Sequence, residues 1–171
     1  MNPDLYNLSG LQQPNSDETT QEQKELSMSE VLDQLYGDIK TLVNTEDTAS
    51  TGAEVAWFCG EKIRKVLGFV LSTPKAKQAM NELSKHLEEV TEGKLSKENV
   101  LTYVRFAETF PDIQIVSRLS DELSLDHFIF ISELDDDMHR IFYSEKCFLE
   151  KWSLGELKLA VKNQLFEKDY S

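Results

Sequence analysis

Residues 123–168 read LSLDHFIFISELDDDMHRIFYSEKCFLEKWSLGELKLAVKNQLFEK. Apolar residues recur every three or four positions in this stretch, and polar breaks divide them into three groups, a pattern typical of short amphipathic helices. We expect these helices over residues 125–131, from the acidic residues 135–137 to about Leu149, and from Ser153 to about Phe166. The stretch therefore predicts an all-α fold.

Towards the N-terminus the same periodicity predicts five further helices, two of which begin with a capping-box signal, serine or threonine followed three residues later by glutamate. That spacing is found for Ser27 with Glu30, for Thr51 with Glu54, and again in the last helix for Ser153 with Glu156. Thr73 followed by Pro74 is a favourable helix start. With only 7 Gly and 4 Pro, the composition favours long helices, with at most one small β-wing.

The chain is expected to form one domain preceded by a tail. Residues 1–24 are polar and lack helical periodicity, so they have little apolar surface to offset the entropy of ordering, and we expect them to be flexible. Residues 25–171 are long enough to enclose a hydrophobic core. We therefore predict a single helical domain over residues 25–171.

Nothing in the sequence points to export or to a membrane. The N-terminal residues have neither the basic region nor the apolar run of a secretory signal, and no apolar run approaches the length that spans a bilayer. A cytoplasmic location is expected. Cys59 and Cys147 lie within helical patterns and are expected to be buried free thiols, because disulfides are rare in that compartment.

The net charge of −13 argues against simple DNA binding, because the overall field repels a polyanion. The charge is unevenly distributed, however. From Gly60 to Arg105 there are nine basic and six acidic residues, a net charge of +3, which leaves −16 for the remainder. A nucleic-acid-binding face is therefore expected in this middle segment, and the alternative is a mixed, solvated helix surface.

A helical hairpin in the middle segment has the shape of a helix-turn-helix. Its predicted helices cover residues 75–90 and 96–109, and the turn between them contains Gly93. The candidate DNA contacts are Lys97 and Asn99 for base edges, Lys75, Lys77 and Lys94 for phosphates, and Ser96, Tyr103 and Arg105 beside them. Any helical hairpin with glycine in its loop has this pattern. The motif alone is therefore also compatible with a hairpin that has only a structural role.

No catalytic or metal-binding arrangement is recognisable. The three histidines fall on separate predicted helices, and HExxH, CxxC and Gly-rich phosphate motifs are absent. Glu156-Leu157-Lys158 matches the E-x-K element of PD-(D/E)XK nucleases, but its glutamate is explained by the capping box. The three acidic residues 135–137 suit the N-terminal end of a helix dipole. We expect no enzymatic activity, no metal and no cofactor.

Several motifs, taken in order, resemble the N-terminal domain of the YhcG-like proteins over about residues 30–168. They are WFCGEKI (57–63), LSKHL (83–87) with GKLSKENV (93–100), VRF (104–106) with FP (110–111), LDH (125–127), RIFY (140–143) and WSLGEL (152–157). In that family the domain precedes a PD-(D/E)XK nuclease domain, and we expect this nuclease domain to be missing here.

The resemblance implies a winged-helix-like domain that binds DNA, with Ser96, Lys97, Asn99 and Arg105 in its recognition helix. Glu98 departs from the family pattern, which has a basic residue there. We therefore expect a non-catalytic DNA-binding accessory module that acts alone or with a separately encoded nuclease. The alternative is an acidic protein-interaction or self-association module, including one that mimics DNA. The candidate partners are accordingly DNA, a separately encoded nuclease or another protein, and a second copy of the chain; no membrane partner is expected.

Overall fold

The computed structural model describes residues 27–45, 51–71 and 74–171, with only the backbone described for residues 69–71. All regular secondary structure in these residues is helical, which confirms the all-α prediction. The small β-wing that the composition left open has no counterpart in them, and the predicted tail over residues 1–24 lies outside them. The helices are α1 (Met28–Asn44), α2 (Gly52–Leu71), α3 (Ala76–Val90), α4 (Lys97–Thr109), α5 (Ile113–Leu119), α6 (Leu125–Ser132), α7 (Asp137–Glu150), α8 (Leu154–Lys162) and α9 (Leu165–Asp169).

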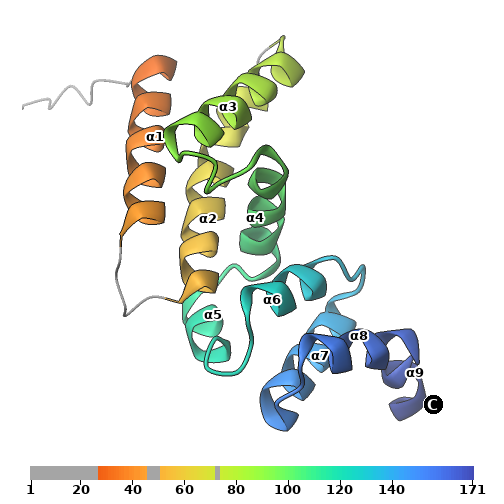
Figure 1. Ribbon diagram of the computed structural model, residues 1–171. Coiled ribbons are helices and arrows are strands. Elements are labelled where there is room, and N and C mark those ends of the chain that lie inside the picture. Colours follow the sequence, from red (N-terminus) through yellow and green to blue (C-terminus); the bar gives the residue numbers. More distant parts are fainter. Residues whose placement is uncertain (1–26, 46–50, 72–73) are drawn as a thin grey trace, which may run out of the picture.

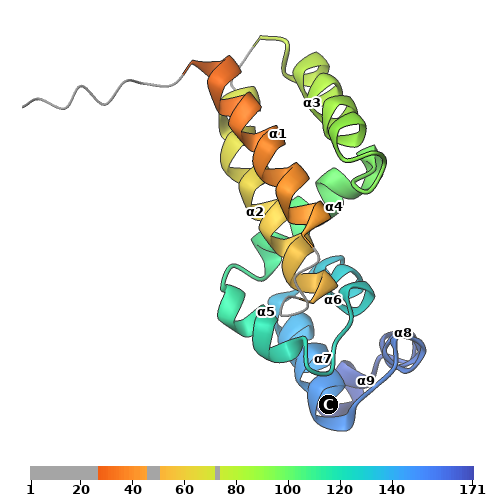
Figure 2. The ribbon, with the colours of Figure 1, turned by 60° about the vertical axis from the view of Figure 1, so that its left-hand side comes forward.

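Helix α2 is the central element of the fold. Helices α1 and α4 pack along it, α3 lies at one end of this group, and α5 to α9 continue from the other end (Figure 1). The start of α1 and the C-terminus lie at opposite ends of the molecule in both views (Figure 2). No helix in the part of the chain that the structure describes is long and apolar enough to cross a membrane.

The helix starts follow the predicted capping chemistry. In each predicted capping box the backbone N–H of the first residue donates to the glutamate carboxylate, at 2.8 Å for Ser27 with Glu30, 2.7 Å for Thr51 with Glu54 and 2.7 Å for Ser153 with Glu156. The hydroxyl of Ser96 accepts the Asn99 N–H at 3.3 Å at the start of α4. Asp136 caps α7 by accepting the Met138 N–H at 2.8 Å, so the acidic residues 135–137 mark a helix start, as expected.

Two predicted boundaries are wrong. The helix predicted to start at Thr73 and Pro74 instead begins at Ala76, and the preceding residue, Lys75, makes no side-chain cap. Pro74 therefore lies in a turn and not at the first helical position. Thr73 lies outside the described residues. The helix expected to run to Phe166 stops at Lys162, because Gln164 adopts a left-handed backbone conformation with φ of 54°. Glutamine has no intrinsic preference for the left-handed conformation, so the residue type at position 164 does not indicate that the helix ends there.

The hydrophobic core consists of two clusters that share α2 and α4. The α1–α4 core is formed by Leu35, Ile39, Cys59, Ile63, Val66, Leu67, Leu83, Leu87, Leu95, Val100 and Val104. The C-terminal core is formed by Ala53, Ala56, Trp57, Phe106, Ala107, Phe110, Val116, Leu123, Phe128, Ile131, Phe142, Tyr143, Cys147 and Leu157. Because α2 and α4 contribute to both clusters, a shift of either helix would disturb the packing of both clusters.

Aromatic residues join α2, α4 and α6 in the C-terminal core. The indole N–H of Trp57 donates to the carbonyl of Phe110 at 2.6 Å, and Trp57 is 7% exposed, so it is a core residue. The Phe128 ring contacts those of Phe106 and Phe110 at centroid distances of 5.1 and 5.2 Å. Both cysteines are buried free thiols, as expected.

Candidate functional site

The turn between α3 and α4 is held by a buried threonine. Thr91 is 1% exposed; its hydroxyl donates to the Leu87 carbonyl at 2.7 Å and accepts the Leu95 N–H at 3.1 Å. Gly93 adopts φ of 80°, which glycine tolerates without steric cost. The predicted hairpin of two helices joined by a turn is therefore present. Thr91 stabilises this turn, a role that was not predicted from the sequence.

The candidate contacts on α4 lie on different faces of the helix. Lys97 and Arg105 are exposed, whereas Asn99 and Tyr103 are half-buried. A residue two positions further along an α-helix is rotated by about 200°, so Asn99 points away from the side that carries Lys97. The exposed face of α4 consists of Lys97, Glu98, Leu101, Arg105 and Glu108. Lys97 and Asn99 therefore do not share one contact surface.

Tyr103 and Ser96 have structural positions. Tyr103 packs against both cores, and burial raises the pKa of its hydroxyl. Ser96 is half-buried and caps α4. A side chain that is held by packing or capping is less able to reach a ligand than one that extends into solvent. Among the candidates on α4, Lys97 and Arg105 are the ones best placed for an external contact.

Ion pairs engage much of the positive charge of the middle segment. The pairs are Lys62 with Asp38 at 3.0 Å, Arg64 and Lys65 with Glu61 at 2.8 and 3.6 Å, and Lys85 with Glu89 at 3.8 Å. The hydrogen bond from Arg64 lowers the pKa of Glu61. Lys94 instead donates to the side-chain oxygen of Asn44 at 2.5 Å. Within the described ranges no ion pair engages Lys75, Lys77, Lys97 or Arg105, all of which are exposed.

The remaining lysines are spread over the hairpin. Lys75 and Lys77 are at the start of α3, whereas Lys94 follows its end, and the 15 residues of α3 cover about 22 Å. Figure 1 shows the start of α3 on the side of the molecule away from α6. Lys75 and Lys77 are therefore separate from the basic pair on α4, and the candidate set does not form one compact patch.

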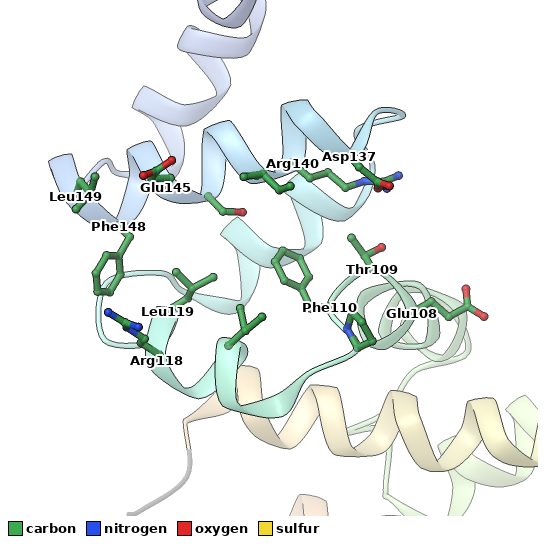
Figure 3. Close-up of a pocket in the computed structure, with 14 residues that line it drawn as sticks. Glu108, Thr109, Phe110, Arg118, Leu119, Asp137, Arg140, Glu145, Phe148 and Leu149 are labelled. Atoms are coloured by element: carbon green, nitrogen blue, oxygen red, sulfur yellow. The ribbon is translucent and has the colours of Figure 1, made fainter.

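A second surface feature is a groove of about 800 Å³ between the end of α4, α5 and α7. We call it the α5–α7 groove. Its middle is apolar, and Figure 3 shows Phe110, Leu119 and Phe148 directed into the space between the helices. Ile115 and Leu149, which also line it, are 50% and 67% exposed. Contiguous exposed apolar surface of this kind is typical of an interaction site.

Two polar groups in the α5–α7 groove lack a hydrogen-bond partner among the residues that the structure describes. They are the hydroxyl of Ser144, which is 7% exposed, and the buried Nε of Arg140. The Nη1 of Arg140 lies 2.5 Å from a carboxylate oxygen of Asp137. In Figure 3, Glu108, Asp137 and Arg140 lie towards one end of the groove, and Arg118 and Glu145 lie towards the other.

The comparisons with known proteins identify the family. Residues 20–168 match the family described as the DUF1016 N-terminal domain. The chain belongs to this family. The match confirms the resemblance to the N-terminal domain of the YhcG-like proteins. Searches of curated proteins and of solved structures found no match.

Residues that carry the family resemblance are largely structural in this DUF1016 N-terminal domain. His127 is 6% exposed; its Nδ1 accepts the Ser124 N–H at 3.1 Å, and its Nε2 lies 2.9 Å from the Trp152 carbonyl oxygen. An Nδ1 that accepts a hydrogen bond leaves Nε2 to carry the proton and donate. His127 therefore joins the start of α6 to Trp152, just before the N-cap of α8, and both ring nitrogens are engaged in the fold.

The catalytic candidates are also accounted for by structural contacts. Across the residues that the structure describes, no group of histidine, cysteine, aspartate or glutamate side chains is arranged to hold a metal ion. Glu156 accepts the N–H of Ser153, which lowers the pKa of Glu156. Burial raises the pKa of both cysteine thiols to about 12, so neither forms a thiolate nucleophile near neutral pH.

The α5–α7 groove was not identified from the sequence. A signal was present in α7, which has more apolar residues than one buried face requires. Phe142, Tyr143 and Cys147 enter the C-terminal core, while Ile141 and Leu149 remain exposed. A helix with apolar residues on two faces needs a second neighbour, but the periodicity does not say whether that neighbour is in the same chain.

Proposed function

We propose that this DUF1016 N-terminal domain is a non-catalytic DNA-binding accessory module that uses the exposed face of α4. The proposal is supported by one observation above all: Lys97 and Arg105 extend from the second helix of the hairpin and have no ion-pair partner within the described residues. A separately encoded nuclease is the expected enzymatic partner.

The spacing of the two cations suits phosphate contacts. Eight residues along α4 separate Lys97 from Arg105, a rise of about 12 Å, which is close to the width of the major groove. Glu98 and Glu108 lie on the same face and oppose close approach to a polyanion. The expected binding is therefore weak, sensitive to salt and independent of base sequence. Asn99 is not part of the proposed contact.

Fluorescence anisotropy with short duplex DNA, titrated with salt, tests the proposal. Replacing Lys97 and Arg105 by alanine should reduce the salt slope by about two units, since each phosphate contact contributes about 0.9. The matched control replaces Lys162 and Lys168 on α8 and α9, which removes the same charge elsewhere and should leave the slope unchanged. The DNA-binding proposal would be overturned if both variants reduced the salt slope equally, or if the wild-type protein showed no saturable DNA binding at low salt.

A second candidate function, an acidic protein-interaction module, is favoured by the α5–α7 groove. The groove offers exposed apolar side chains with charged residues at both ends, which is the arrangement of a polar-rimmed interface. Light scattering after size-exclusion chromatography, with and without DNA, separates the two candidates. A species indifferent to DNA favours the interaction module, and a DNA-dependent increase in mass favours the DNA-binding module.

A further inference from the structure

Helix α7 presents an unpartnered face of coiled-coil spacing to the α5–α7 groove. Four of its lining residues are separated by four, three and four positions, the spacing along which two helices pack side by side. They are Asp137, Ile141, Ser144 and Phe148. The opposite face of α7 is buried in the C-terminal core. This seam on α7 is therefore shaped for one additional helix.

Buried polar atoms on this seam point to a ligand that supplies hydrogen-bond acceptors. The Ser144 hydroxyl and the Arg140 Nε are buried, and neither has a hydrogen-bond partner within residues 27–45, 51–71 and 74–171, although buried polar groups in folded proteins are nearly always bonded. Arg140 Nε can only donate, and the Ser144 hydroxyl can donate as well. A carbonyl or carboxamide oxygen on an incoming helix would satisfy both groups.

The charge around the groove favours a basic occupant over a second copy of this chain. Residues 106–171, which contain every residue that lines the groove, have 14 acidic and 7 basic residues, a net charge of −7. Glu108 and Glu145 lie at opposite ends of the groove, with Arg118 at the Glu145 end, and Asp137 is paired with Arg140. The groove lining thus has three acidic and two basic side chains, a net charge of −1. Two copies would bring like charges together, whereas a positively charged partner is attracted.

We propose that the α5–α7 groove binds an amphipathic helix of a basic partner protein. Apolar residues of that helix, spaced by three and four positions, enter between Ile115 and Ile141, and its lysine or arginine residues approach Glu108 and Glu145. An acceptor on the helix meets Ser144 and Arg140. The proposal rests on the second candidate function and does not require DNA binding.

The probe is a synthetic amphipathic peptide of about 16 residues with leucines at three- and four-residue spacing and lysines beside them. Two comparison peptides replace the leucines by glutamine or the lysines by glutamate. Binding is measured by fluorescence anisotropy to the full chain. The leucine–lysine peptide should bind saturably, and each comparison peptide should bind at least about tenfold more weakly.

A matched pair of variants locates the site. Ile141→Asp alters the groove, and Leu159→Asp introduces the same group on α8; these side chains are 61% and 57% exposed, so neither change removes core packing. Ile141→Asp should weaken peptide binding at least about tenfold, and Leu159→Asp should not. Because the added aspartate attracts a basic peptide, a loss in Ile141→Asp cannot come from overall charge. Circular dichroism confirms that both variants fold.

Three results would overturn the proposal. Equal binding by Ile141→Asp and Leu159→Asp would show that the peptide follows the overall acidic field. Equal binding of the lysine and glutamate peptides would exclude a basic occupant. A wild-type dimer that Ile141→Asp converts to a monomer would assign the groove to a second copy. Independence from the DNA proposal is tested with the Lys97 and Arg105 alanine variant, which should bind the peptide normally even if its DNA binding is lost.

Discussion

Gly60 lies directly against the backbone of Tyr103 where α2 crosses α4. A β-carbon at Gly60 would lie 2.0 Å from the Tyr103 carbonyl oxygen and 2.5 Å from its carbonyl carbon. Backbone atoms cannot rotate away as the end of a side chain can, so only glycine allows the two helices to approach this closely. Because α2 and α4 contribute to both cores, this crossing controls the packing of the whole domain.

Gly60→Ala should lower the free energy of unfolding by about 3 kcal/mol, the upper end of the usual cost of an overpacked core. Urea denaturation followed by circular dichroism measures it. The matched control is Gly37→Ala in α1, where an added β-carbon meets nothing within 4 Å. That change should stabilise the protein by about 0.5–1 kcal/mol, because alanine favours a helix over glycine. Similar effects at the two positions would show that the crossing is not tight.

The crossing explains what the sequence could and could not predict. Capping at Ser27, Thr51 and Ser153 depends on residues three positions apart, so it was correctly predicted. The role of Gly60 depends on Tyr103 in α4, which is 43 positions away, and the WFCG motif was recognised by resemblance without a physical reason. The uncovered face of α7 is likewise set by tertiary packing, and nothing in the local sequence marks the left-handed backbone of Gln164.

The same reasoning applies to the candidate DNA contacts. The sequence correctly indicated a helix–turn–helix hairpin, because its turn is marked by Gly93 and its second helix by the Ser96 cap. The sequence could not indicate that Lys97 is exposed while Asn99 is half-buried, because the buried face of a helix depends on the neighbouring helices that it packs against. The packing of α4 against α2 makes Tyr103 a core contact and leaves Arg105 exposed.

Trp57→Phe should remove the indole donor to the Phe110 carbonyl and lower the free energy of unfolding by about 1–3 kcal/mol. The buried carbonyl would lose a 2.6 Å hydrogen bond that phenylalanine cannot replace. Denaturant unfolding is again the measurement. Trp152→Phe is the comparison, since no side-chain hydrogen bond of Trp152 is present in the described part of the chain, and it should cost less. A larger loss at Trp152 would argue that the Trp57 hydrogen bond contributes little.

Both cysteines should be unreactive in the folded protein. Burial raises the pKa of the Cys59 and Cys147 thiols to about 12, and Lys62 and Glu156 adjust these values as minor influences. A thiol reagent such as 5,5′-dithiobis(2-nitrobenzoic acid) at pH 8 should therefore modify neither residue until urea unfolds the chain. Following absorbance against urea concentration measures this, and rapid modification of the native protein would contradict the burial of these thiols.

His139 links α7 to α9 and should make the docking of α9 dependent on pH. Its Nε2 lies 2.9 Å from a Glu167 carboxylate oxygen, and its ring packs on Phe166 at a centroid distance of 4.2 Å. The hydrogen bond to Glu167 raises the pKa of His139, with Asp136 adding to the effect, and the same bond lowers the pKa of Glu167. Each group therefore titrates differently when α9 is docked and when it is released.

The sign of the effect follows from these directions. A raised histidine pKa stabilises docking fully below its ordinary value of 6.5, and this stabilisation is lost as pH rises through the higher, docked value. A lowered glutamate pKa stabilises docking above its ordinary value of 4.5, and this is lost as pH falls through the lower, docked value. Docking of α9 should therefore be strongest between these two ordinary values.

Amide hydrogen exchange over residues 165–169, corrected for the intrinsic effect of pH, should show greater protection near pH 5.5 than near pH 8. His139→Gln should remove most of this difference, because glutamine does not titrate. His86→Gln is the control: His86 is exposed on α3, away from α9, and its replacement should leave the difference intact. If His139→Gln kept the full pH dependence, another group would have to control the docking of α9.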